Sequence, residues 1–154
     1  RIPHLPLRMT EHSQRTQIFA ERLHAMGMHV CYPGLPDHPD HDLMRELYCP
    51  DYGYGGVLTL DMGTEDHANE LLELLQNEYH FGYVAVSLGY FDTLMSCSGS
   101  STSSELSDED KTAAHISPGL VRLSIGYTGT TEQRWVQLSE ALQRIGTPGE
   151  RQIA

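Results

Sequence analysis

The fold is decided by the segment Ile116-Ser117-Pro118-Gly119-Leu120-Val121-Arg122-Leu123-Ser124-Ile125-Gly126. From Leu120 to Ile125, apolar and polar residues alternate, which is the period of a β-strand with one buried face. The alternation predicts a strand whose Arg122 points away from the apolar side. An arginine in this position is either the partner in a structural salt bridge or a clamp for a carboxylate, because its planar guanidinium can bind both carboxylate oxygens. The pattern alone leaves both interpretations open.

Working outward from this strand, three further segments predict strands: 28–32, 57–62 and 83–86. Apolar residues recur at helical spacing in four others, which predict helices over 10–26, 40–48, 65–77 and 131–145. Helices mixed with short strands in this way predict an α+β fold, an α/β sandwich in which a small sheet is covered by helices.

The ends of these helices carry recognisable signals. Thr10, Thr64 and Thr130 are each placed to accept a hydrogen bond from a free backbone N–H in the first turn of a helix. Gly27 and Gly146 follow the first and last helices, where glycine commonly ends a helix. We therefore expect the first helix to begin at Thr10 and to end at Gly27.

Composition restricts the classes of partner. The chain has 154 residues, which suits one compact domain, and its formal charge of -11 with only ten basic residues argues against nucleic acid or an anionic membrane surface. It contains no apolar run long enough to span a membrane, and its first residues lack the order of a signal peptide. The first residue is Arg1 rather than Met, which fits a fragment or a processed product.

Cysteine and histidine spacing gives no sign of a disulfide framework or a metal site. Cys31, Cys49 and Cys97 are an odd number of cysteines at wide spacing, which favours a reducing compartment, and we expect a cytoplasmic protein. His38 and His41 are the nearest pair of candidate ligands, but no third ligand stands at a suitable spacing, so no metal is expected.

Several segments could carry chemistry, and each also has a structural interpretation. The segment 96–104 is rich in serine, so it is either a flexible linker or a loop whose hydroxyls and N–H groups hold an anion. Ser87 follows a predicted strand and either closes a turn or lines a binding site. The segment 32–39 indicates a rigid surface turn, and Cys97 has no adjacent histidine to activate it as a nucleophile.

Four strings, in this order, resemble the C-terminal third of the Cys/Met-metabolism family of pyridoxal-phosphate enzymes. They are Leu5-Pro6-Leu7-Arg8-Met9 with His12, Tyr32-Pro33-Gly34-Leu35 with His38-Pro39, Val86-Ser87-Leu88-Gly89, and the segment 116–126. The last string is the most specific. Finer details, such as Tyr52-Gly53-Tyr54-Gly55-Gly56 and the segment 87–95, resemble the plant methionine gamma-lyase branch of that family. Ser103 departs from it, because many relatives carry histidine there.

The resemblance implies the small C-terminal domain of a fold-type-I pyridoxal-phosphate enzyme, an antiparallel sheet with helices packed on one face. It implies a connecting helix over 1–27, a substrate-binding domain over 28–146 and a polar tail over 147–154. It also implies that Arg122, Ser87 and Thr102 bind the substrate carboxylate. In the family, a lysine of the preceding large domain holds pyridoxal 5'-phosphate. The chain's single lysine, Lys111, lies in an acidic polar stretch, so we expect no catalytic residue here and no activity of this chain alone.

The activity that the resemblance implies is the conversion of L-methionine to methanethiol, 2-oxobutanoate and ammonia, once this chain is joined to its own large cofactor domain. The expected partners are that domain, an amino acid substrate and further copies in a homotetramer. Two alternatives stay open: the C-terminal domain of a cystathionine gamma-synthase or gamma-lyase, and a stand-alone interaction module that kept the fold without catalysis.

Overall fold

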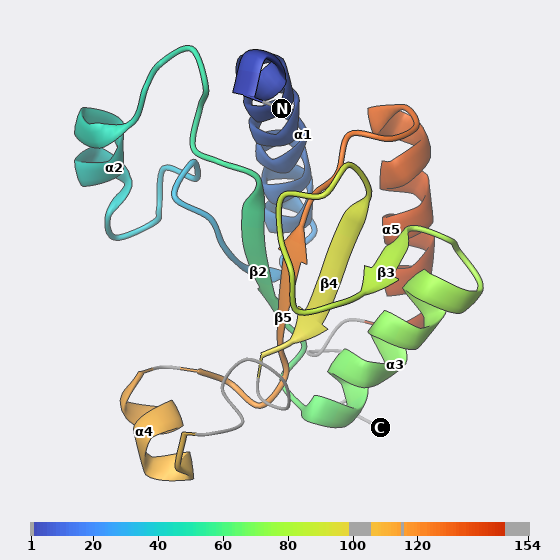
Figure 1. Cartoon of the computed structure of the whole chain (residues 1–154). Helices are drawn as coiled ribbons and strands as arrows, with labels where there is room; N and C mark the ends of the chain where they lie inside the picture. Colours follow the sequence, from blue (N-terminus) through green and yellow to red (C-terminus); the bar gives the residue numbers. More distant parts are fainter. Residues whose placement is uncertain (1, 99–105, 115, 147–154) are drawn as a thin grey trace.

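The computed structural model describes residues 2–98, 106–114 and 116–146. In chain order its elements are η1 (Ile2–His4), α1 (Leu5–Ala25), β1 (His29–Cys31), α2 (His41–Leu47), β2 (Val57–Asp61), α3 (Glu65–Asn77), β3 (Gly82–Val84), β4 (Thr93–Cys97), α4 (Asp108–Ala113), β5 (Leu120–Ser124) and α5 (Thr131–Ile145). The strands form one sheet in the order β1-β2-β5-β4-β3, which places β5 at its centre (Figure 1).

The sheet is mostly antiparallel, as predicted, with one exception. β2 and β4 both pair antiparallel with β5, and β1 pairs antiparallel with β2. β3 runs parallel to β4, which was not expected from the sequence. The chain between β3 and β4 therefore crosses from one end of the sheet to the other instead of turning back in a hairpin.

One face of the sheet forms the core with the long helices. Val121 and Leu123 of β5 are fully buried together with Leu58, Leu60 and Met95 of the neighbouring strands. They belong to the same cluster as the apolar stripes of α1, α3 and α5, and α1 and α5 pass behind the strands in Figure 1. The prediction of helices on one face is confirmed. Burying this stripe is the main stabilising contribution, at roughly 25 cal/mol per Å² of apolar surface.

The opposite face of the sheet is covered by backbone rather than by a helix. The segment 85–92, between β3 and β4, runs over this face in front of β5 (Figure 1). All five residues of β4 are buried, because the helices cover one of its faces and this segment lies over the other. The central strand β5 thus has an apolar side and a polar side, and the polar side carries Arg122.

The predicted caps of α3 and α5 are confirmed. Thr64 Oγ1 accepts a hydrogen bond from His67 N at 3.3 Å, and Thr130 Oγ1 accepts one from Gln133 N at 3.1 Å. Gly27, with φ +76°, follows the end of α1, where a left-handed conformation favours glycine.

The predicted start of the first helix is wrong. α1 begins five residues earlier, at Leu5, with a proline in its first turn, where the missing N–H of proline costs no hydrogen bond. Thr10 lies within the helix, and its hydroxyl donates to Asp51 O at 3.2 Å instead of capping.

Two elements were not predicted from the sequence. The last two residues of β4, Ser96 and Cys97, lie in the segment predicted as a serine-rich loop, and α4 lies in an acidic polar stretch that shows no apolar stripe. A third difference concerns α2, whose apolar residues at helical spacing predict packing against a neighbour. It contains no buried residue, and Leu43 and Leu47 are exposed.

Candidate functional site around Arg122

Arg122 lies at the middle of the central strand, on the face away from the helices. Its register partners are Thr59 on β2 and Ser96 on β4. It is half-buried, between the fully buried Val121 and Leu123. The alternation of buried and polar residues therefore places the Arg122 side chain on the polar face of the sheet, as predicted.

The guanidinium holds the segment that crosses this face. Arg122 Nη2 donates to Ser87 O at 2.9 Å and lies 3.3 Å from Ala85 O. The structure thus brings together two of the three residues predicted for the site, Arg122 and Ser87. Their contact is made through the backbone carbonyl of Ser87, and the residue itself is exposed.

One N–H donor of Arg122, at Nε, is left without an acceptor among the described residues. This Nε is buried, and Ser96 Oγ, across the strand pair, is likewise buried without a hydrogen-bond partner in the described part of the chain. Buried polar atoms are almost always hydrogen-bonded, so two unpartnered ones at register partners are unusual. A guanidinium N–H without an acceptor suits a carboxylate oxygen, which forms a charge-assisted hydrogen bond with it. No salt bridge to Arg122 is present among the described residues, which argues against the structural interpretation.

The serine-rich segment begins in strand β4 and continues into residues that the structure does not describe. Ser96 and Cys97 belong to β4, so the prediction of a loop beginning at Ser96 is wrong. Thr102, the third predicted site residue, lies outside the described residues. Cys97 Sγ donates to Pro118 O at 3.5 Å, which gives it a packing role at the end of β5.

Sequence reasoning missed the residues of α1 that fix the end of β5. The buried His12 donates through Nδ1 to Ile125 O at 2.5 Å, and its ring packs edge-on against Tyr127. One turn later, Arg15 donates to Thr128 O and to Gly129 O, both at 2.8 Å. The signal available in the sequence was the polar series Arg8, His12, Arg15, which lies on one face of a helix.

A second anchor lies at the other end of the crossing segment. Arg134 of α5 forms an ion pair with Asp92 at 3.0 Å and donates to Thr128 Oγ1 at 2.8 Å. Asp92 and Arg134 are both largely buried, with side chains 16% and 17% exposed. This pair fixes the segment where it enters β4.

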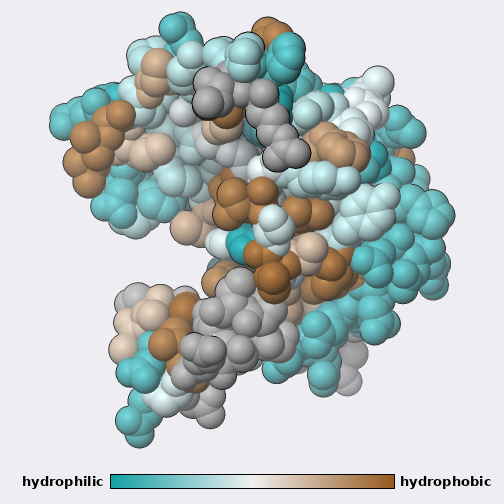
Figure 2. All heavy atoms as spheres, viewed as in Figure 1, coloured by the Kyte–Doolittle hydropathy of each residue, from teal (hydrophilic) through white to brown (hydrophobic). Residues whose placement is uncertain are grey.

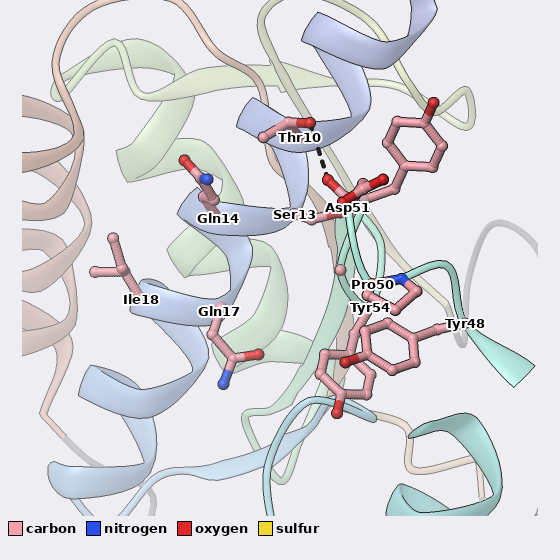
Figure 3. A pocket seen from close by; sticks show the side chains of 11 residues that line it. Thr10, Ser13, Gln14, Gln17, Ile18, Tyr48, Pro50, Asp51 and Tyr54 are labelled. Carbon is pink, nitrogen blue, oxygen red and sulfur yellow. Dashed lines mark hydrogen bonds between the residues drawn. The ribbon is translucent and has the colours of Figure 1, made fainter. Parts of the chain in front are cut away.

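A cavity lies elsewhere, between α1 and the loop 48–54. It has a volume of about 490 Å³ and is lined by Gln14, Gln17 and Ile18 of α1 and by Tyr48 and Tyr54 of the loop, among others (Figure 3). Tyr48 and Tyr54 stack at 4.6 Å between ring centroids, and desolvation together with the neighbouring Tyr48 raises the pKa of Tyr54. Neither Arg122 nor Ser87 lines this cavity.

The segment that Arg122 holds also presents an apolar surface. Val84, Val86 and Leu88 are exposed, with 48%, 66% and 61% of their surface accessible. Figure 2 shows apolar side chains gathered in the middle of this face. Contiguous apolar surface of this kind commonly marks an interaction site.

Two kinds of feature are absent from the described part of the chain. Within residues 2–98, 106–114 and 116–146 no group of three or more His, Cys, Asp or Glu side chains could hold a metal ion. No helix in the same ranges is long and apolar enough to cross a membrane.

Comparison with known proteins finds relatives that match most of this chain. It is 60% identical over 145 residues to methionine gamma-lyase of Arabidopsis thaliana, covering 94% of this chain and 33% of the relative. It is 34% identical over 125 residues to L-methionine gamma-lyase of Porphyromonas gingivalis, covering 79% of this chain and 30% of that protein. The chain therefore spans about a third of the length of these curated relatives.

Solved structures match the fold. The crystal structure of cystathionine gamma synthase from Xanthomonas oryzae pv. oryzae in complex with cystathionine superposes with a TM-score of 0.81 at 30% identity, over 92% of this chain and 35% of that one. A putative O-acetylhomoserine (thiol)-lyase from Campylobacter jejuni gives a TM-score of 0.81 at 27% identity, over 91% of this chain and 32% of that one. The mixed α/β domain with its mostly antiparallel sheet corresponds to the C-terminal part of fold-type-I pyridoxal-phosphate enzymes.

The family profile described as Cys/Met metabolism PLP-dependent enzyme matches residues 2–142. With that match and the 60% identity to a plant relative, the chain belongs to the Cys/Met metabolism family of pyridoxal-phosphate-dependent enzymes, as a methionine gamma-lyase-like C-terminal portion.

Proposed function

We propose that this chain is the substrate-carboxylate-binding portion of a pyridoxal-phosphate-dependent carbon–sulfur lyase that converts L-methionine to methanethiol, 2-oxobutanoate and ammonia. One observation carries the proposal: within the described residues, Arg122 Nε and Ser96 Oγ are buried without a hydrogen-bond partner, on two residues that are register partners. The identity of 60% to a methionine gamma-lyase supports the choice of substrate.

In this proposal the α-carboxylate of the amino acid accepts a hydrogen bond from the Nε–H of Arg122, while Nη2 stays bound to the Ala85 and Ser87 carbonyls. The resemblance to the family adds Ser87 and Thr102 to the residues proposed to bind the carboxylate. Fixing the carboxylate limits the rotation of the substrate and so aligns the bonds at its α-carbon for reaction. Water is excluded from the buried side of the guanidinium, which strengthens the ion pair.

Pyridoxal 5'-phosphate, when bound, supplies the electron sink for bond breaking next to the amino group. The residues of this chain do not fit its covalent attachment. The single lysine, Lys111, lies on α4, which stands apart from the sheet that carries Arg122 (Figure 1). We infer that the cofactor is held by the large domain and that this chain alone is inactive. The proposed partners are this domain, packed on the apolar residues 84–88, and further copies in a homotetramer.

A hybrid enzyme tests the proposal. This chain would replace the matching third of the Arabidopsis methionine gamma-lyase, and methanethiol release from L-methionine would be measured with pyridoxal phosphate present. We expect activity in the hybrid and none in the chain alone. Arg122→Ala should remove on the order of 2 to 4 kcal/mol of transition-state stabilisation, as for a lost buried charge pair. Arg45→Ala is the matched control, because Arg45 is exposed and forms an ion pair with Asp42 in its own helix, away from Arg122.

The outcomes separate the alternatives. A folded, cofactor-loaded hybrid whose methionine kinetics do not depend on Arg122 contradicts the proposal. Preference for cystathionine over methionine favours the cystathionine gamma-synthase or gamma-lyase alternative. A hybrid that binds cofactor but processes neither amino acid favours the stand-alone interaction module.

A further inference from the structure

The segment 85–89 is held by two arginines, and only one of them belongs to the proposed carboxylate site. Arg122 contacts the carbonyls of Ala85 and Ser87. Arg8 of α1 donates through Nη2 to Gly89 O at 2.7 Å. Three alternate carbonyls of one short extended segment are therefore bound by guanidinium groups from two different elements.

Gly89 itself has few hydrogen bonds, whereas Phe91 O, two residues later, accepts from Tyr127 N at 2.8 Å and from Thr128 N at 3.2 Å. Gly89 N donates to Ser124 Oγ at 3.0 Å, and this is the other hydrogen bond to Gly89 among the described residues. The side of the segment away from the sheet is open, since Val86, Leu88 and Tyr90 are exposed. The position of Ser87 relative to Arg122 therefore depends on whether Gly89 is held in place.

Arg8 is itself fixed by its surroundings. Its guanidinium carbon lies 6.0 Å from the ring centroid of Tyr127, a cation–π distance. It stands one turn before His12, whose ring contacts the same tyrosine and binds Ile125 O. The contact with Tyr127 therefore orients the Arg8 guanidinium toward Gly89.

We propose that Arg8 is a positioning residue for the substrate carboxylate: it fixes Gly89 and so sets the position of Ser87 relative to the Nε–H of Arg122. Arg8 does not contact the substrate. Because Arg8 lies in the second turn of α1, the proposal also ties the carboxylate pocket to the helix that precedes the whole sheet. The inference rests on the proposed function of Arg122.

The test uses the cofactor-loaded holoenzyme that carries this chain as its C-terminal portion, with Arg8→Met and Arg8→Lys variants. For Arg8→Met we expect the KM for L-methionine to rise about tenfold, as for one lost hydrogen bond from a charged donor. The kcat should change by less than about twofold, because only substrate positioning before the reaction is affected. Arg8→Lys should restore part of the affinity, since an ammonium can still donate to Gly89 O but cannot bind through a planar fork.

Two further readouts separate positioning from a structural role. L-methionine amide lacks the carboxylate, so its specificity constant should fall less in Arg8→Met than that of L-methionine. Backbone amide hydrogen exchange over residues 85–92 should become faster in Arg8→Met, while exchange in β2 and β5 stays as in the unmodified enzyme. Arg22→Met is the control, because Arg22 also lies on α1 but pairs with the exposed Glu132.

The possible results distinguish this inference from the proposed function. If Arg122→Met leaves methionine use unchanged, the proposed function fails and this inference fails with it. If Arg122→Met impairs methionine use but Arg8→Met alters neither KM nor exchange over 85–92, only the role of Arg8 is overturned. If Arg8→Met accelerates exchange throughout the protein, Arg8→Lys decides: a raised KM with normal exchange in β2 and β5 supports positioning, and an unchanged KM overturns it.

Discussion

Ser96 and Arg122 are register partners on β4 and β5, and each has a buried polar atom without a hydrogen-bond partner in the described part of the chain, Ser96 Oγ and Arg122 Nε. The strand pair fixes the separation of their backbones, and in the proposed function these two residues face the substrate carboxylate. A buried group of this kind destabilises the empty protein, and a ligand that accepts its hydrogen bond offsets the cost.

Ser96→Ala should therefore leave the free energy of unfolding unchanged or raise it by about 1 kcal/mol, because the lost hydroxyl had no partner. Ser124→Ala is a matched comparison, since Ser124 is equally buried but accepts a hydrogen bond from Gly89 N. It should lower the free energy by about 1 kcal/mol. Denaturant unfolding of the two variants would measure both free energies. A clear loss of stability in Ser96→Ala would show that its hydroxyl has a partner after all.

Tyr32 should make the protein sensitive to alkaline pH. Burial raises the pKa of its hydroxyl above the usual value, with Tyr54 and Glu21 adding to the effect, and the hydroxyl donates to Gly55 O at 2.9 Å. A raised pKa in the folded state means stability that is fully present below the unfolded pKa of about 10 and is lost as the pH rises above it. The free energy of unfolding should fall above about pH 10, and less steeply in Tyr32→Phe.

Unfolding by denaturant at a series of pH values checks this. At neutral pH, Tyr32→Phe should cost about 1 kcal/mol for the lost hydrogen bond. Tyr52→Phe, at an exposed tyrosine, serves as the control and should keep the alkaline slope of the unmodified chain. Identical slopes in the Tyr32→Phe variant and the unmodified chain would contradict the prediction.

Arg134→Met should destabilise the fold strongly, by about 2 to 4 kcal/mol, because it leaves the largely buried Asp92 carboxylate unpaired. Arg144→Met is the surface comparison. Arg144 and Glu78 form an exposed pair, and exposed pairs contribute little, so its unfolding midpoint should not move. Equal shifts in the two variants would mean that Asp92 is solvated.

Gly126→Ala should be among the most damaging small substitutions, at about 3 kcal/mol or more, because an added Cβ would lie 2.3 Å from Asp92 C and 2.5 Å from Phe91 O. Gly27→Ala meets no atom within 4 Å and carries only the strain of φ +76°, roughly 1 kcal/mol. Thermal unfolding of the two variants separates steric overlap from backbone strain. A milder effect at Gly126 than at Gly27 would argue against this close approach of two backbones.

Local signals in the sequence determined much of the secondary structure. Helices α3 and α5 were predicted with their caps, because a threonine hydroxyl that binds a first-turn N–H acts within four residues of chain. Strand β5 was predicted because its two faces differ, one packed on the helices and one polar. The outward direction of Arg122 followed from the same alternation.

Tertiary structure decided what local signals could not. β4 was missed because both of its faces are buried, which removes the alternation that marks a strand. The early start of α1 was missed because Thr10 resembles a cap but its hydroxyl binds Asp51, 41 residues away in the chain. The domain boundaries at 27 and 146 stay a prediction.

The sequence by itself determined the family, the helix caps and an arginine on the polar face of a strand, since each depends on residues close together in the chain. Only the tertiary structure placed Ser87, Gly89 and Ser96 around the guanidinium groups of Arg122 and Arg8, because these contacts join segments 26 to 81 residues apart. The order of the strands in the sheet brings them together.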